Sequence, residues 1–235
     1  MQRRKYSFRT DQPVYRRSHR ITTFFFNALG KLESYGSENV PMQGGVLLVS
    51  NHVSLPDPVI IGTAANRELH YMARHDVFRI PGLSWLITAL NAYPVHRGAA
   101  DRAALKHTLS LLKMGKAVLI FPEGTRGVGG VLGKALGGAS FIAYRANVPT
   151  IPVFLKGAEQ MMPRDAKWLK PAKLSVTFGQ PIDFKKILGI VDRREAQRRI
   201  GELIMHSIAK LRDKQEHLQK GVKSSPPNPK MIDPS

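Results

Sequence analysis

Short apolar runs of strand length alternate with helical stretches along most of the chain, and this alternation is what most restricts its fold. The expected strands are residues 46–50, 69–73, 117–121, 150–155 and 173–178. Between them, Asp101 can cap a helix on which Leu105, Leu109 and Leu112 share one face. Strands separated by helices favour a mostly parallel sheet that is covered by helices. We therefore predict an α/β fold with a central, mostly parallel sheet.

The expected domain runs from residue 31 to residue 220 and ends in a long helix. Asp192 and Glu195 resemble a capping box at its start. The apolar residues behind them lie on one face: Ala196, Ile200, Leu203, Ile204, Ile208 and Leu211. Serine, proline and asparagine at 224–229 are incompatible with regular structure, so residues 221–235 are expected to form a flexible tail.

Residues 1–30 form a basic segment that becomes amphipathic. Its first twenty residues contain six arginines: Arg3, Arg4, Arg9, Arg16, Arg17 and Arg20. An apolar stripe at helical spacing follows: Ile21, Phe24, Phe25, Ala28, Leu29 and Leu32. Basic residues beside a phenylalanine-rich stripe are typical of a helix that lies in a membrane interface, although such a stripe can also pack on the main domain. No apolar run approaches the roughly 18–20 residues that span a bilayer, so the expected contact is peripheral.

The charge indicates an anionic partner. Lysine and arginine total 36 against 17 aspartate and glutamate, which gives a net charge of +19. Nucleic acids and anionic membranes both attract such a surface. No helix-turn-helix, zinc-finger or RNA-binding signature appears, so a basic nucleic-acid-binding protein is the alternative with charge alone in its favour. The chain has no cysteine, and its histidines lack the spacing of zinc ligands, so we expect no metal site.

The first candidate site lies directly after the strand at 46–50. His52 is a plausible general base because the ordinary pKa of histidine, about 6.5, lies near working pH. Asp57 follows five residues later, in a loop that two prolines stiffen. A carboxylate that folds back onto the imidazole would fix its tautomer and stabilise its protonated form. Taken alone, this spacing occurs more often without function.

Three further junctions carry ligand-binding residues. After the strand at 117–121, Gly124 allows close backbone approach, and Thr125 and Arg126 can donate to phosphate oxygens. Arg97 follows an apolar stretch and is a second candidate anion ligand. The segment 148–153 contains two prolines at an unusual strand entry. Taken separately, the last two junctions read as scaffold.

In their order and spacing, these four stretches resemble the motifs of the 1-acylglycerol-3-phosphate acyltransferase family. They are Asn51-His52 with Asp57, Tyr93 with Arg97-Gly98, the run FPEGTR at 121–126, and 148–153. The resemblance covers about residues 31–181 and includes the stretches 35–41 and 137–139. Asn91, Pro94 and Gly127 depart from residues common in that family.

The resemblance implies transfer of a fatty acyl group from an acyl thioester to the sn-2 hydroxyl of 1-acylglycerol 3-phosphate, which gives phosphatidate. It implies that His52 deprotonates the acceptor hydroxyl and that Asp57 orients His52. The residues that it assigns to the substrate are Asn51, Arg74, Arg97, Glu123, Gly124, Thr125 and Arg126. Pro149 and Pro152 would shape a wall of the site.

A thioester is already activated, so this chemistry requires a base and an oxyanion donor, and no nucleophile of the protein's own or cofactor. Accordingly, the chain has no G-x-S-x-G run. The sequence leaves open whether acyl carrier protein or coenzyme A carries the acyl group. Glycerol 3-phosphate, a lyso-ornithine lipid and other lysophospholipids remain alternative acceptors. We expect the protein to act at the cytoplasmic side of the cell membrane.

Overall fold

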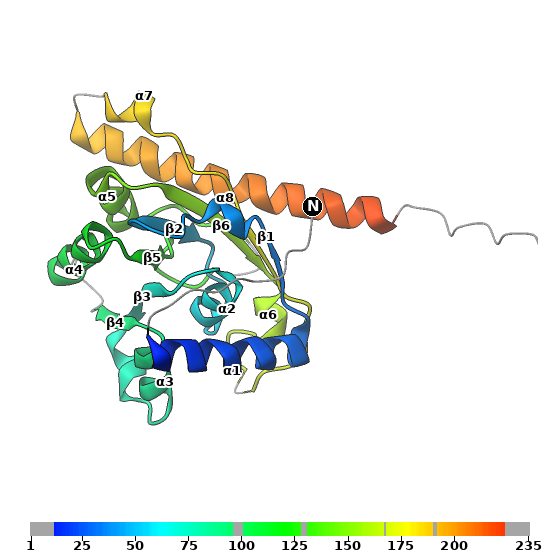
Figure 1. Ribbon diagram of the computed structural model, residues 1–235. Helices are drawn as coiled ribbons and strands as arrows, with labels where there is room; N and C mark the ends of the chain where they lie inside the picture. Colours follow the sequence, from blue (N-terminus) through cyan, green and yellow to red (C-terminus); the bar gives the residue numbers. More distant parts are fainter. Residues whose placement is uncertain (1–11, 96–100, 128–130, 167, 190–191, 224–235) are drawn as a thin grey trace, which may run out of the picture.

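A computed structural model describes residues 12–95, 101–127, 131–166, 168–189 and 192–223. At its centre lies a seven-stranded sheet in the order β1-β7-β6-β2-β5-β3-β4 (Figure 1). The strands are β1 (Glu33–Tyr35), β2 (Val46–Ser50), β3 (Leu69–Arg74), β4 (Ala92–Val95), β5 (Ala117–Ile120), β6 (Thr150–Lys156) and β7 (Ser175–Phe178). Neighbouring strands pair in parallel except β6 and β7, which are antiparallel. The predicted α/β fold is confirmed.

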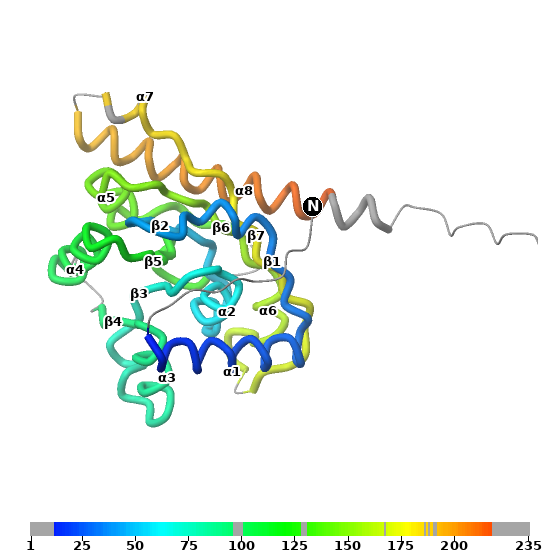
Figure 2. The backbone as a smooth tube through the Cα atoms, in the orientation of Figure 1, coloured from blue at the N-terminus to red at the C-terminus, as the bar shows by residue number. Residues whose placement is uncertain are grey.

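Helices cover both faces of this sheet. They are α1 (Pro13–Gly30), α2 (Asp57–Ala64), α3 (Leu83–Ala89), α4 (Arg102–Lys113), α5 (Gly137–Ala146), α6 (Ala158–Met161), α7 (Lys185–Leu188) and α8 (Arg193–Lys223), with 3-10 turns η1 (Ser37–Asn39) and η2 (His75–Arg79). Figure 1 shows α1 and α2 on one face and α4, α5 and α8 on the other. The backbone trace shows α8 running past α5 and on beyond the sheet (Figure 2).

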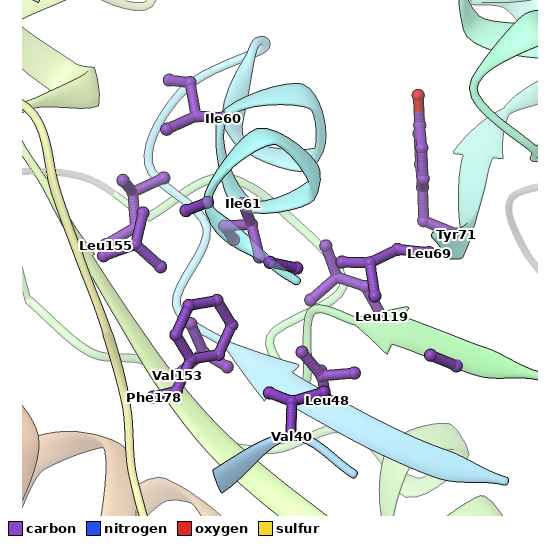
Figure 3. Packing of buried hydrophobic residues seen from close by; sticks show 14 of the residues in the cluster. Val40, Leu48, Ile60, Ile61, Leu69, Tyr71, Leu119, Val153, Leu155 and Phe178 are labelled. Carbon is purple, nitrogen blue, oxygen red and sulfur yellow. The ribbon is translucent and has the colours of Figure 1, made fainter. Parts of the chain in front are cut away.

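The central strand β2 has all five residues buried because helices cover it on both faces. Leu48 belongs to the core between the sheet, α1 and α2, where it lies with Ile60 and Ile61 (Figure 3). Leu47 and Val49 belong to the opposite core, against α4, α5 and α8. These two cores hold β2 rigidly, so the residues that follow its carboxyl end have a fixed starting point.

The long C-terminal helix packs as its pattern predicts. Ala196, Ile200, Ile204 and Ile208 of α8 are fully buried. Asp101 also caps its helix, since its side chain accepts a hydrogen bond from the backbone N–H of Ala104. The helix α8 continues to Lys223, slightly past the expected boundary at 220, and the rest of the expected tail lies outside the described residues.

Helix α1 begins at Pro13, well before the predicted apolar stripe. The buried side of α1 is largely polar: Tyr15, Ser18, His19, Thr22, Phe26 and Gly30. Thr22 accepts a hydrogen bond from Thr63 of α2 at 2.9 Å, and the hydroxyl of Tyr15 accepts one from the backbone N–H of Leu69 at 3.1 Å. The apolar side faces outward, with Phe24 77% exposed. Within the described part of the chain, no helix has the length and apolar character that a bilayer crossing requires.

The predicted stripe divides between two environments. Ile21, Phe24 and Phe25 are exposed, whereas Leu32 is buried in the core and Leu29 packs partly against it. The reading in which the stripe packs on the main domain therefore holds for its last residues, and the membrane reading stays a prediction for its first residues. Its first residues lie on the outer side of α1, and its last residues fasten the chain to the sheet.

Candidate active site

His52 and Asp57 meet at the junction between β2 and α2. His52 lies two residues after β2, and Asp57 is the first residue of α2. Nδ1 of His52 lies 2.8 Å from Oδ2 of Asp57. The same oxygen accepts hydrogen bonds from the backbone N–H groups of Val53 and Ser54, at 2.7 and 2.9 Å. The carboxylate is completely buried, so these contacts hold it in place.

The imidazole of His52 is positioned to accept a proton at Nε2. A carboxylate partner at Nδ1 selects the tautomer in which Nδ1 carries the hydrogen and Nε2 is the acceptor. The ring stacks on Phe121, with centroids 4.1 Å apart and planes inclined by 20°. The His52 side chain is 19% exposed. One ring edge is therefore held by the protein, and a small exposed part remains for a substrate.

Glu123 ties the FPEGTR loop to the backbone around it. Its Oε2 accepts a hydrogen bond from the N–H of Gly133 at 2.9 Å, and its Oε1 lies 3.4 Å from the N–H of His52. The N–H of Gly127 donates to the carbonyl oxygen of His52 at 2.7 Å. The resemblance assigned Glu123 to the substrate, whereas the contacts of its carboxylate here are to protein backbone. These contacts align two loops that carry motif residues.

Asn51 joins β2 to β6 beyond their paired residues. Its side-chain amide donates to the carbonyl oxygen of Leu155 at 2.9 Å and accepts from the N–H of the same residue at 2.8 Å. Asn51 is buried. Its amide group therefore replaces a pair of strand hydrogen bonds and sets the direction in which the chain continues to His52. The resemblance assigned Asn51 to substrate binding, whereas the side-chain contacts of Asn51 here are to protein backbone.

The remaining FPEGTR residues face outward at the same sheet edge. Gly124 and Thr125 are exposed and Arg126 is half-buried. Gly124 has a φ of +65°, a left-handed backbone conformation that favours glycine, and a Cβ atom there would also require the exposed side chain of Leu136 to move. Arg74 ends β3 at this edge and forms an exposed ion pair with Asp76. Arg97 lies outside the described residues.

The two prolines of the last motif do not reach the His52 edge. The carbonyl oxygen of Pro149 accepts a hydrogen bond from the N–H of Leu47, near the amino end of β2. Pro152 is buried within the sheet opposite Val49. Because β6 runs parallel to β2, Pro149 lies at the end of the sheet opposite to His52. The structure therefore does not bring Pro149 into a wall of this site.

A cleft of about 110 Å³ opens beside His52 and contains residues that sequence reasoning missed. One wall comes from His52, Glu123 and Leu132. The other comes from the end of β6 at Phe154–Lys156 and from two residues of α8, Arg212 and Glu216. A signal for the α8 residues was available, because they continue the four-residue spacing of the buried stripe that ends at Ile208.

Comparisons with known proteins give matches in sequence and in fold. A family model described as Acyltransferase matches residues 31–156. A 1-acyl-sn-glycerol-3-phosphate acyltransferase of Bacillus subtilis is 30% identical over 65% of this chain and 74% of that protein. A chloroplastic enzyme of that name from Brassica napus is 30% identical over 73% of this chain, which spans 50% of its length. The crystal structure of the 1-acyl-sn-glycerophosphate (LPA) acyltransferase PlsC from Thermotoga maritima superposes with a TM-score of 0.66 at 25% identity, covering 84% of this chain and 79% of that one.

Proposed function

The chain belongs to the acyltransferase family, and from this premise we propose that it transfers a fatty acyl group from an acyl thioester to the sn-2 hydroxyl of 1-acylglycerol 3-phosphate. The product is phosphatidate, a step of phospholipid biosynthesis. The observation that carries the proposal is the 2.8 Å contact between His52 and Asp57, held against the FPEGTR loop by the bond from Gly127 to His52. The acceptor in this proposal is taken from the names of the relatives given above.

The reaction requires one base and two substrates. Nε2 of His52 takes the proton of the acceptor hydroxyl while that oxygen attacks the carbonyl carbon of the thioester. The tetrahedral intermediate collapses, the carbon–sulfur bond breaks, and the departing sulfur receives the proton from His52. The products are the new ester and a free thiol, and the protein returns to its starting state. Asp57 stabilises the imidazolium between the two proton transfers.

We propose that this chemistry uses no bound cofactor, since the acyl carrier is a co-substrate. General base catalysis contributes typically about 10²–10⁴-fold. Holding both substrates in contact removes a further large entropic part of the barrier. Asp57 and Phe121 hold His52 in one position, which fixes where the acceptor hydroxyl must lie. This rigid support therefore helps to lower the entropic part of the barrier.

The phosphate of the acceptor is assigned to the FPEGTR side of the site. Arg126 provides a planar guanidinium that can bind two phosphate oxygens at once, and the exposed Gly124 and Thr125 allow the phosphate to approach the backbone. Arg97, which lies outside the described residues, is proposed to assist in binding this phosphate. Arg74 is engaged with Asp76, so its contribution would require that ion pair to open.

We further propose that the outer side of α1 rests on the cytoplasmic surface of an anionic membrane. Besides Phe24, the exposed apolar residues in this region include Ile21 and Phe25 of α1, and Trp85 of α3 is 68% exposed. The helices α1 and α3 contact one another, so these side chains belong to neighbouring elements. Arg16, Arg17 and Arg20 are exposed on α1 and would each add roughly 1 kcal/mol near anionic lipid. The net charge of +19 would then favour binding to the anionic lipid surface.

An acceptor screen tests the proposed function. The purified protein is supplied with one labelled acyl thioester and, separately, with lysophosphatidate, glycerol 3-phosphate, a lyso-ornithine lipid and other lysophospholipids. Labelled phosphatidate, formed only with active His52, is the expected product. Labelling of another acceptor in place of lysophosphatidate would keep the mechanism and reject the proposed substrate. A double-stranded DNA binding assay at physiological salt provides the check against the nucleic-acid alternative.

A further inference from the structure

The cleft beside His52 reaches from the catalytic loop to α8. We propose that this cleft binds the 4′-phosphopantetheine arm that carries the acyl group as a thioester, with Arg212 and Glu216 as its ligands on α8. Coenzyme A and acyl carrier protein share this arm, so the assignment covers both donors. The inference rests on the proposed function, because it places the second substrate of that reaction.

Arg212 and Glu216 continue the row of α8 that packs against the sheet. Ala196, Ile200, Ile204 and Ile208 follow one another at a spacing of four residues and are fully buried. The next two positions at this spacing are Arg212 and Glu216, and both line the cleft. Residues at this spacing form one ridge on a helix surface. The ridge therefore changes from apolar to charged where it leaves the core and reaches the cleft.

The cleft reaches β6, which borders β2 on the side away from β5. In the sheet, β2 has β5 on one side and β6 on the other. Arg126, the proposed phosphate ligand, follows β5 and does not line the cleft, which extends from Glu123 and Leu132 past His52 to the end of β6 and to α8. The acceptor hydroxyl and the thioester carbon must meet beside the same base. A donor that enters along β6 and α8 reaches His52 without crossing the acceptor.

The lining combines apolar and charged side chains, which suits an arm that carries both polar groups and short apolar stretches. The apolar lining residues are Val53, Val131, Leu132, Phe154 and Leu155, and the charged ones besides His52 are Glu123, Lys156, Glu159, Arg212 and Glu216. Covering these charges with an alkyl chain would remove their hydration without replacing it. The pantetheine arm contains two amides, a hydroxyl and a phosphate. Its carbonyl and phosphate oxygens can accept from Arg212, and its N–H groups can donate to Glu216.

Arg212 is also free to change its partner. Its side chain is 33% exposed, and its Nε lies 3.0 Å from Oδ1 of Asp213, which is itself exposed. An exposed ion pair of this kind is weak, because solvent screens it. The guanidinium can therefore exchange Asp213 for a bound anionic ligand.

The test compares Arg212→Ala and Glu216→Gln with wild type in steady-state acyl transfer. Acyl-coenzyme A and acyl-(acyl carrier protein) are each used with lysophosphatidate. Arg212→Ala is expected to raise the KM of both donors about tenfold, the loss of one charge-assisted hydrogen bond. Glu216→Gln should raise both in the same direction by less, since its amide oxygen still accepts. The acceptor KM should stay at its wild-type value. The matched control is Arg198→Ala, an exposed arginine of α8 whose partners are Glu195 and Glu202.

A calorimetric titration of the full chain with free coenzyme A provides a second readout, in which Arg212→Ala should weaken binding by the same factor. A raised acceptor KM with unchanged donor KM would overturn the assignment, and so would an effect on only one donor or on neither. Should Arg212→Ala fail to fold, Arg212→Gln replaces it. If the wild type acylates no acceptor, the proposed function fails, and the coenzyme A titration still decides whether the cleft binds the arm.

Discussion

Oδ2 of Asp57 accepts hydrogen bonds from Nδ1 of His52 and from the backbone N–H groups of Val53 and Ser54. One buried oxygen therefore holds both the imidazole and the loop that carries it. The other side of the imidazole is stacked on Phe121. This arrangement makes Nε2 the one ring nitrogen available to a substrate, and the first prediction concerns it.

Replacing His52 with alanine should lower kcat by about a hundredfold or more, because the general base is lost. The unfolding temperature should stay close to that of the wild type, since the His52 side chain contributes little to the packing of either core. Asp57→Asn should lose rate nearly as severely, because the imidazolium loses its anionic partner. The measurement is single-turnover acyl transfer together with thermal unfolding. A folded His52→Ala protein with near-normal turnover would contradict the mechanism.

Replacing Arg126 with alanine should raise the acceptor KM or lower kcat/KM for the acceptor by about ten- to a hundredfold. A charge-assisted hydrogen bond contributes roughly 1.5–3 kcal/mol, and about 1.4 kcal/mol corresponds to a factor of ten. The donor KM should move less and serves as the internal control. Equal changes for both substrates would indicate a general disturbance of the loop that Glu123 holds.

Replacing Phe24 and Phe25 with serine should release the protein from anionic vesicles in a flotation assay. Both side chains are exposed, so folding should be preserved. Met114→Ser is the matched control, because Met114 is exposed but follows α4 on the other face of the sheet. High salt should weaken vesicle binding without abolishing it, since only the electrostatic part is screened. Acylation of a soluble short-chain acceptor should persist, and undiminished flotation would show that another surface makes the membrane contact.

Stability should fall as the pH drops from about 6.5 towards 4. Burial lowers the pKa of His19 to about 4, and burial also lowers that of His70 to about 4. In this window the unfolded chain binds protons that the folded chain cannot, so protonation favours unfolding. The slope of unfolding temperature against pH should be shallower in His19→Gln and His70→Gln than in the wild type. An unchanged slope in both variants would show that these histidines are not the cause.

The sequence by itself determined five of the seven strands that the structure describes, and it predicted that His52 and Asp57 lie together. Alternating apolar runs predicted the parallel sheet, since a strand such as β2 that is covered on both faces must be apolar throughout. The contact between His52 and Asp57 could also be predicted, because they are only five positions apart in a loop with Pro56 and Pro58, and the family resemblance gave the pair its expected role. Both inferences depend on patterns within short stretches of the chain.

Only the tertiary structure decided which residues share the site. Asn51 binds Leu155, Glu123 holds the backbone of Gly133, and Pro149 lies at the far end of the sheet. The α8 residues Arg212 and Glu216 reach the same cleft as His52 from more than half the chain away. The order of the motifs indicates that these segments form one site, but strand order and register decide which strand ends lie next to one another. That information comes from packing between distant segments, which a local pattern does not contain.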